Sequence, residues 1–188
     1  MVSQSQFAER VQECTDRLTA TGVDALGALF DLTSHRLVRF AVAVTRNQHD
    51  AEDAVQTALV RLAGKPELLR PVGAPWPYLL RMVRNEALLV GRRKQRCHAT
   101  GDLIDLVTFC PVDELEREEC HRAVWSALRT LPPEQAEVVV LKIWEDMTFA
   151  QIGQILETSP NTVASRYQYA MTRLTRRLAG QQREAQRG

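Results

Sequence analysis

Apolar residues recur at helical spacing along nearly the whole chain, and no segment shows the strict alternation of a half-buried strand. Near the N-terminus four apolar side chains repeat at i, i+4, i+7 and i+11: Phe7, Val11, Cys14 and Leu18. This spacing predicts an amphipathic helix over about residues 4–20. We expect its apolar stripe to pack on the helices that follow, although such a stripe could instead receive a regulatory protein. The chain as a whole is predicted to be all-α.

Proline and glycine divide this helical pattern. Residues 66–77 contain four prolines and one glycine, so they are expected to form a loop. Residues 97–112 lose the helical period, and Pro111 closes that stretch. We therefore predict two small helical domains joined by a flexible linker. The predicted segments are an N-terminal helical extension at 1–24, a first domain at 25–96, an acidic linker at 97–118, a second domain at 119–180 and a frayed tail at 181–188.

The charges are distributed unevenly along the chain. The formal net charge is only +1, because 24 Lys and Arg nearly balance 23 Asp and Glu. Residues 71–96 carry +5, residues 97–119 carry −6 and residues 148–188 carry +4. The near-zero total therefore conceals two basic blocks, and it does not exclude two separate surfaces that bind nucleic-acid phosphates.

The composition excludes several classes of protein. Apolar residues make up 45% and charged residues 25%, which is typical of a folded globular protein. There is no run of about 18 apolar residues and no secretory signal pattern, so we expect a cytoplasmic protein that does not contact a membrane. We find no phosphate-binding glycine loop, metal-ligand set or nucleophile–base pair. The sequence therefore predicts no catalytic residues and no cofactor.

The cysteines leave one alternative open. Cys14, Cys97, Cys110 and Cys120 form no C-x-x-C pair, and in a reducing compartment they are expected to be free thiols. However, Cys97, Cys110 and Cys120 lie near two histidines in the sequence. A redox or metal role for these three thiols stays open, although their spacing matches no zinc signature.

Residues 148–178 have the pattern of a helix-turn-helix. Thr148 with Gln151 predicts a capping box for a short helix, and Ser159 followed by Pro160 predicts the start of a second helix. Small and polar side chains there could reach base edges in a major groove, and an arginine could contact phosphate. The candidate DNA-binding residues are Ser159, Asn161, Thr162, Ala164, Ser165, Arg166 and Gln168. The alternative is a plain helical hairpin with a solvated polar face.

A second candidate DNA-binding segment opens the helix predicted from about residue 76 to residue 96. Aromatic side chains beside cations suit unpaired bases, because the rings stack on the bases while the cations follow the phosphates. The candidates are Trp76, Tyr78, Arg81, Arg84, Asn85, Arg92 and Arg93. The alternative is that both aromatic residues belong to the core and that the basic run is a solvated helix end.

The segment DAEDAVQ at 50–56 begins another predicted helix, for which Asp50 is a plausible N-cap. Its spacing places Asp50, Asp53 and Gln56 on the face opposite the apolar stripe. Such an acidic, amide-tipped patch could bind an arginine-rich partner surface. The alternative is a solvated helix start, where the helix dipole favours acids.

Taken in order, three of these segments resemble one known family. DAEDAVQ at 50–56, YLLRMVRNEAL at 78–88 and LPPEQAEVVVLKIWEDMTFAQIGQILETSPNTVASRYQYAMTRL at 131–174 resemble regions 2 and 4 of bacterial RNA polymerase sigma factors of the extracytoplasmic-function (ECF) group. The resemblance implies a region 2 helical bundle, a region 4 helix-turn-helix and a non-enzymatic role in promoter-specific initiation. Glu157 departs from the family, which usually has glycine in this turn. A positive φ at Glu157 would store strain of about 1 kcal/mol.

The resemblance also implies partners. These are core RNA polymerase, through its β′ clamp and β subunits, promoter DNA and an anti-sigma factor. The helix from Trp76 to Arg96 would capture an unpaired base of the −10 element, the helix from Ser159 would read the −35 element, and the linker at 97–118 would pass through the polymerase interior. The alternative hypothesis is that the protein is a helix-turn-helix regulator that acts without polymerase. The residues implied to dock on the β′ clamp are Asp50, Glu52, Asp53 and Gln56.

Overall fold

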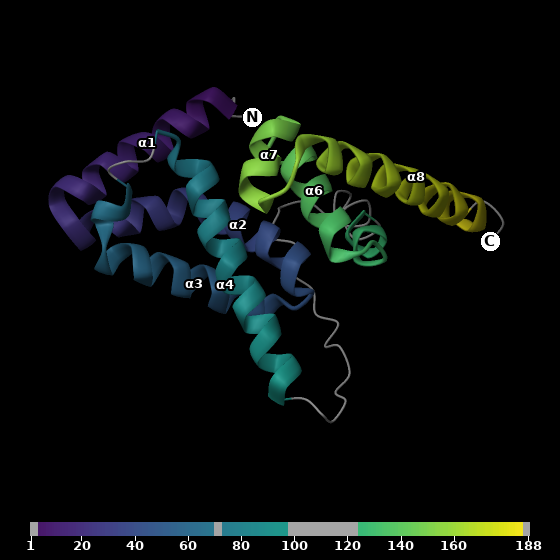
Figure 1. Cartoon of the computed structure of the whole chain (residues 1–188), viewed down its shortest axis with the longest axis horizontal. Helices are drawn as coiled ribbons and strands as arrows, with labels where there is room; N and C mark the ends of the chain where they lie inside the picture. The colour runs from purple at the N-terminus through teal and green to yellow at the C-terminus, as the bar shows by residue number, and fades with distance from the viewer. Residues whose placement is uncertain (1–3, 70–72, 98–123, 186–188) are drawn as a thin grey trace. The chain divides into compact units, whose positions relative to one another are not determined.

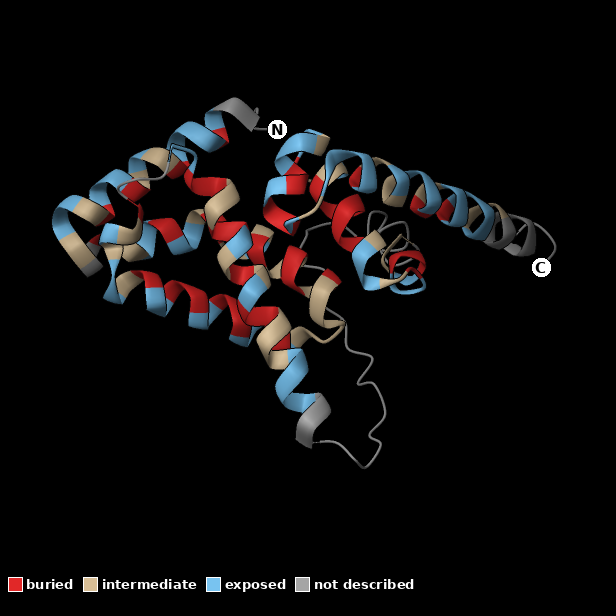
Figure 2. Cartoon of the chain, in the orientation of Figure 1, coloured by how far each residue is buried: buried red, intermediate tan, exposed pale blue. Residues whose placement is uncertain are grey.

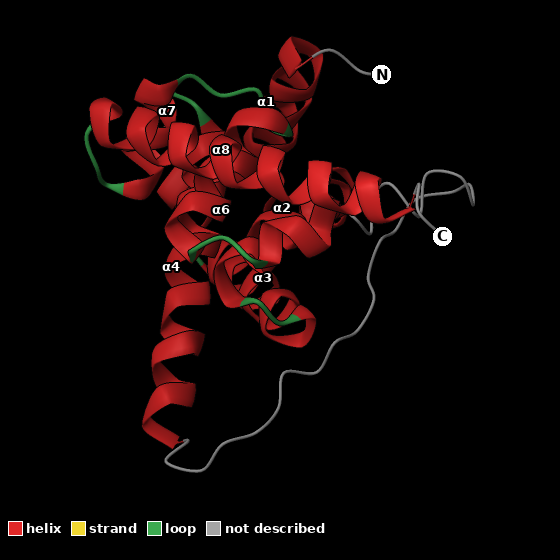
Figure 3. Ribbon diagram, turned by 90° about the vertical axis from the view of Figure 1, so that its right-hand side faces the viewer, coloured by secondary structure: helices red, strands yellow, loops and turns green. Residues whose placement is uncertain are grey.

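The computed structural model describes residues 4–69, 73–97 and 124–185 of the chain (Figure 1). Within these ranges every regular element is a helix and none is a strand (Figure 3), so the all-α prediction is confirmed. Backbone contacts divide the chain into two compact units, residues 1–105 and residues 106–188. Apart from Cys97, which ends a helix, the predicted linker lies outside the described residues.

The first unit is a bundle around an apolar core. Helices α2, α3 and α4 pack against one another, and α1 packs against α2 and α4. The amphipathic pattern near the N-terminus is confirmed, because Phe7, Val11 and Leu18 are buried while Cys14 is half-buried. Figure 2 shows buried and exposed residues recurring along α1. The elements are α1 (Gln4–Thr21), the 3-10 turn η1 (Gly22–Ala25), α2 (Leu26–Thr45), α3 (Gln48–Gly64), the 3-10 turn η2 (Pro66–Leu69) and α4 (Pro75–Cys97).

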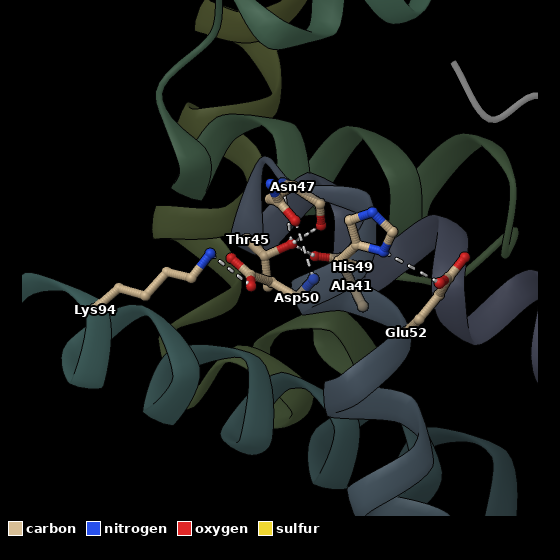
Figure 4. Close-up of polar contacts among 7 residues, drawn as sticks. All are labelled: Ala41, Thr45, Asn47, His49, Asp50, Glu52 and Lys94. Atoms are coloured by element: carbon tan, nitrogen blue, oxygen red, sulfur yellow. Dashed lines mark hydrogen bonds and ion pairs between the residues drawn. The ribbon is translucent and has the colours of Figure 1, made fainter. Parts of the chain in front are cut away.

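The N-cap of α3 is Asn47, and the prediction that Asp50 caps this helix is wrong. The Asn47 side chain accepts a hydrogen bond from the Asp50 backbone N–H at 3.0 Å (Figure 4). Asn caps a helix as well as Asp does, and Asn47 lies three residues earlier in the sequence. The Asp50 carboxylate is thereby left for a contact with another helix.

Two ion pairs join α3 to α4. Lys94 Nζ lies 2.8 Å from Asp50 Oδ1 (Figure 4), and Arg61 pairs with Glu86. Both carboxylates are buried, whereas the two cations keep about half of their side chains in water. Each pair joins an acid on one helix to a base on the other, and the pairs favour the observed antiparallel alignment. Removing either cation would leave a buried charge without compensation.

The second unit contains a helical turn at residues 124–129 and three longer helices. Its core is apolar, and the fully buried residues Leu141, Ile152 and Ile155 anchor it. Helix α8 packs against both α6 and α7, and α6 also contacts α7. The three helices are α6 (Pro133–Ile143), α7 (Phe149–Leu156) and α8 (Pro160–Ala185).

Helix α8 runs further than the sequence pattern indicates. The apolar repeat ends at about Leu178, but the helix continues to Ala185, so residues 181–185 are helical where a frayed tail was predicted. The added segment is rich in Ala, Gln, Arg and Glu, which are strong helix formers even without a packing partner. Residues 186–188 lie outside the described part. Among the described helices, none is long and apolar enough to cross a membrane.

Candidate DNA-binding and partner-binding faces

The turn between α7 and α8 has the geometry of a helix-turn-helix. The capping box is confirmed: the Thr148 N–H donates to Gln151 Oε1 at 2.9 Å, and the Gln151 N–H donates to Thr148 Oγ1 at 3.3 Å. Glu157 ends α7 with φ 54°, so this glutamate occupies the left-handed region that its non-glycine side chain disfavours. Glu157 and Thr158 both donate their backbone N–H to the Gly153 carbonyl.

Gly153 permits this tight turn because it has no side chain. A Cβ added at Gly153 would lie 2.7 Å from the Thr158 carbonyl oxygen. That oxygen belongs to the backbone of the turn and cannot rotate away as a side chain would. The glycine therefore allows the end of α7 to approach the start of α8 closely.

The start of α8 is capped as predicted. Ser159 Oγ accepts a hydrogen bond from the Thr162 N–H at 3.1 Å and lies 2.8 Å from Thr162 Oγ1. Pro160 opens the helix. Ser159 therefore has a structural role that its exposed position does not by itself indicate.

The first half of α8 presents one polar face. The side chains of Asn161, Thr162, Ser165 and Gln168 are exposed, and those of Ala164 and Arg166 are half-buried. The opposite face is held in the core by Val163, Ala170 and Leu174, while Tyr167 lies against Phe149 with 5.7 Å between ring centroids. All the candidates from the sequence thus lie outside the buried stripe, and Ser159, Asn161 and Thr162 lie at the positive end of the helix dipole. Sequence reasoning missed Tyr169, which is 67% exposed and follows Ser165 by one helical turn.

The two aromatic residues at the start of α4 lie on different sides of the helix. The prediction that Trp76 binds DNA is therefore wrong. The Trp76 side chain is buried, and its ring lies 4.9 Å from that of Phe7, so it is not available to stack on a base. Tyr78, only two residues later, is half-buried and lies on another side of the helix. The sequence showed aromatics next to cations but gave no local sign that α1 covers one of them.

The remaining candidates on α4 form one face. Tyr78, Arg81, Asn85 and Arg92 follow one another at i, i+3, i+7 and i+14, opposite the buried Leu79, Leu80, Val83 and Ala87. Arg81, Asn85, Arg92 and Arg93 are exposed, and Arg84 is half-buried at the edge. We call Tyr78, Arg81, Asn85 and Arg92 the α4 face. It combines a ring, an amide and cations along one side of a helix.

The acidic face of α3 is smaller than predicted. Asp50 is only 8% exposed and is paired with Lys94, so it does not belong to the exposed patch. Glu52, Asp53 and Gln56 are exposed, and Glu52 accepts a hydrogen bond from Gln48 at 2.6 Å. Glu52, Asp53, Gln56 and the neighbouring Val60 are called the α3 face below.

Val60 was missed by sequence reasoning. It is 67% exposed, and it lies one turn beyond Gln56 on the same side of α3. Single exposed apolar side chains are common on protein surfaces, so Val60 has meaning here only through the acidic and amide groups beside it. The signal available in the sequence was that Val60 lies away from the apolar stripe of α3.

The question of a metal or redox role falls largely outside the described residues. Cys110, Cys120, both neighbouring histidines and the Cys97 side chain lie outside the described part of the structure. Cys14 is a free, half-buried thiol. In the described ranges, no three His, Cys, Asp or Glu side chains are grouped so that they could hold a metal ion.

Two family models match the chain, one in each unit. Residues 29–97 match Sigma-70 region 2, and residues 121–174 match Sigma-70, region 4. The α3 and α4 faces lie within the first match, and the polar start of α8 lies within the second. Helix α1 precedes both matches.

Two curated RNA polymerase sigma factors are similar to this chain over most of their length. The RNA polymerase sigma-E factor of Streptomyces coelicolor is 31% identical over 151 residues, which cover 79% of this chain and 83% of that protein. The ECF RNA polymerase sigma factor SigM of Mycobacterium tuberculosis is 32% identical over 154 residues, covering 82% of this chain and 77% of SigM.

Solved structures share the fold. The sigma factor RpoE of Bartonella quintana, in complex with the anti-sigma factor NepR, matches with a TM-score of 0.67 at 23% identity, covering 80% of this chain and 94% of that one. CnrH, in complex with the cytosolic domain of CnrY, matches with a TM-score of 0.65 at 21% identity, covering 92% of this chain and 98% of that one.

Proposed function

Because this chain belongs to the extracytoplasmic-function group of the sigma-70 family, and is a transcription factor rather than an enzyme, we propose that it binds core RNA polymerase and selects promoters with −35 and −10 elements. The observation that carries the proposal is the presence, on one chain, of the α3 face, the α4 face and the polar start of α8. Each face has a chemistry suited to a different partner.

The α3 face is proposed to dock on the β′ clamp. Glu52 and Asp53 supply negative charge, Gln56 supplies an amide and Val60 supplies an apolar contact. These groups complement a partner surface that is rich in arginine. Asp50 has a supporting role in this proposal, because it pairs with Lys94 and fixes the start of α3 against α4.

The α4 face is proposed to hold the melted −10 strand. The Tyr78 ring can stack on an unpaired base, Asn85 can hydrogen-bond to a base edge, and Arg81 and Arg92 can contact phosphates. Binding an unpaired base stabilises melted DNA, because the base is withdrawn from its duplex partner. Trp76 takes no direct part.

The start of α8 is proposed to read the −35 element in the major groove. Asn161 and Gln168 carry amides that can pair with adenine, and Ala164 can contact a thymine methyl group. Arg166, Arg173 and Arg176 can reach phosphates on the groove walls. A helix N-terminus directed at the DNA adds a favourable dipole.

Replacing Arg166 with alanine is expected to weaken binding to −35 duplex DNA and to make that binding less dependent on salt. Loss of one phosphate contact should lower the slope of log K against log salt by about 1. The measurement is fluorescence anisotropy of the full chain with labelled duplex at several salt concentrations. Arg10→Ala, which removes an exposed cation of α1, is the matched control and should leave the slope unchanged. An unchanged slope for Arg166→Ala would exclude this phosphate contact.

We further propose that an anti-sigma factor controls this chain. One solved neighbour named above is a sigma factor in complex with the anti-sigma factor NepR, and the other, CnrH, is in complex with the cytosolic domain of CnrY. The predicted linker at 97–118 lies within the −6 block of residues 97–119 and is proposed to run through the polymerase interior, where this negative charge would mimic a nucleic acid.

A regulator that acts without polymerase is the rival function. Under this hypothesis only the helix-turn-helix has a function, and Asp53 and Gln56 have none. The match of residues 29–97 to region 2 favours the sigma factor proposal over this rival.

A further inference from the structure

Three side chains from three helices meet at the start of α4. The Phe7 ring of α1 packs edge-on against the Trp76 indole, with 4.9 Å between centroids and 85° between planes. The Arg36 guanidinium of α2 lies 3.7 Å from the Phe7 ring centroid and 5.4 Å from that of Trp76. We call Phe7, Arg36 and Trp76 the brace cluster. Its Phe7 lies outside the residues matched to region 2.

Ring contacts, and not a hydrogen bond, hold the indole of Trp76. Phe7 is 6% exposed and Trp76 is 5% exposed, so each ring is almost fully removed from water. The Trp76 Nε1–H is buried and has no hydrogen-bond partner among the described residues. A buried donor without an acceptor disfavours this position. The indole therefore stays inside because packing and the cation–π contact outweigh that cost.

The position of Trp76 fixes the rotation of the first turn of α4. Trp76 lies at the N-terminal end of the buried stripe that continues through Leu79, Leu80 and Val83. Tyr78 and Arg81 follow Trp76 by two and five residues, which places both on the opposite side of the helix. When the indole is held inside, Tyr78 and Arg81 are directed away from the core.

We propose that α1 is a brace for −10 recognition: Phe7 and Arg36 hold Trp76 in the core and thereby present Tyr78 and Arg81 to the unpaired DNA strand. This inference rests on the proposed function of the α4 face. In this proposal the three residues of the brace cluster are positioning residues, because they act through Tyr78 and Arg81. The inference gives α1, which precedes both family matches, a role in promoter melting.

The test uses holoenzyme assembled from the full chain and core polymerase of its host. The probe is forked promoter DNA whose −10 non-template segment is single-stranded, and the affinity for core polymerase is measured separately. Phe7→Ala should weaken fork binding about tenfold, equivalent to ~1.4 kcal/mol, without changing core affinity. Phe7→Leu should stay within about threefold of the wild type, because it keeps most of the buried volume. Arg36→Met removes the cation above both rings and should weaken fork binding several-fold.

Leu18→Ala is the matched control on the same helix. Leu18 is fully buried, and it lies eleven residues from Phe7, or about 16 Å along α1. Leu18→Ala should lower the free energy of unfolding but leave fork binding nearly unchanged. If α1 only stabilises the unit, the two alanine variants will lose fork binding in proportion to their loss of stability.

That proportional loss would overturn the brace, and so would unchanged or tighter fork binding by Phe7→Ala. If Phe7→Ala does not fold, Arg36→Met decides the question, and wild-type fork affinity for Arg36→Met would overturn the brace. A wild-type chain that does not bind core polymerase would instead contradict the proposed function, before any variant is compared.

Discussion

Replacing Gly153 with alanine is expected to disrupt the helix-turn-helix and to abolish binding to −35 duplex DNA. The new Cβ would lie 2.7 Å from the Thr158 carbonyl oxygen, so the backbone of the turn must move. The carbonyl of Gly153 also accepts the N–H groups of Glu157 and Thr158, and the shift would strain both bonds. We expect a loss of about 1–3 kcal/mol in the free energy of unfolding, as for other overpacked sites. Urea unfolding and anisotropy with labelled duplex measure the two effects.

Gly91→Ala is the matched control for this change. Gly91 lies within α4, and a Cβ added there meets no atom within 4 Å. Alanine should stabilise the helix at this position by up to about 1 kcal/mol, because glycine loses more backbone entropy on folding. If Gly153→Ala were as well tolerated as Gly91→Ala, the close approach between α7 and α8 would not constrain this turn.

Reversing the charge of Asp53 is expected to weaken core polymerase binding at least tenfold. Asp53 lies on the exposed α3 face beside Gln56, and its backbone is part of a regular helix. Asp53→Arg therefore places a cation against a partner surface that is proposed to be cationic, without disturbing the fold. A like-charge contact of this kind costs on the order of several kcal/mol in a formed interface. The measurement is the affinity of the full chain for core polymerase at fixed salt.

Asp31→Arg is the control for Asp53→Arg. Asp31 is exposed on α2, so the substitution makes the same change in net charge at a different surface. It should leave core affinity within about twofold of the wild type, since long-range charge effects are screened at ordinary salt. Equal losses for the two variants would show that the total charge, rather than the α3 face, governs the affinity.

Features set by neighbouring residues could be predicted from the sequence. The capping box of Thr148 and Gln151 and the N-cap at Ser159 each depend on a few adjacent positions. The amphipathic helix near the N-terminus was also predictable, because its apolar spacing persists over several turns. Patterns of this kind need no knowledge of the tertiary structure.

Features that depend on distant contacts could not be predicted. Trp76 is buried because Phe7, from a helix 69 positions earlier in the sequence, packs on it. Asp50 leaves the acidic patch because Lys94, 44 positions later, pairs with it. Both residue types would suit an exposed binding site in isolation, and only the packing of α1, α3 and α4 decides otherwise.

The end of α8 shows a third kind of difference. The apolar repeat that marks a helix stops near Leu178, whereas local helix propensity carries the backbone on to Ala185. Periodicity indicates which residues face a core, whereas helix propensity depends on the residue types alone.

The central claim is that this chain directs core polymerase to promoters, and mapping transcript starts tests it most directly. Holoenzyme reconstituted from the full chain and host core polymerase would transcribe host genomic DNA, and the 5′ ends of the transcripts would be sequenced. We predict start sites downstream of two shared motifs at a constant spacing, absent with core polymerase alone and lost with Asp53→Arg. Start sites identical to those of core polymerase alone would contradict the account.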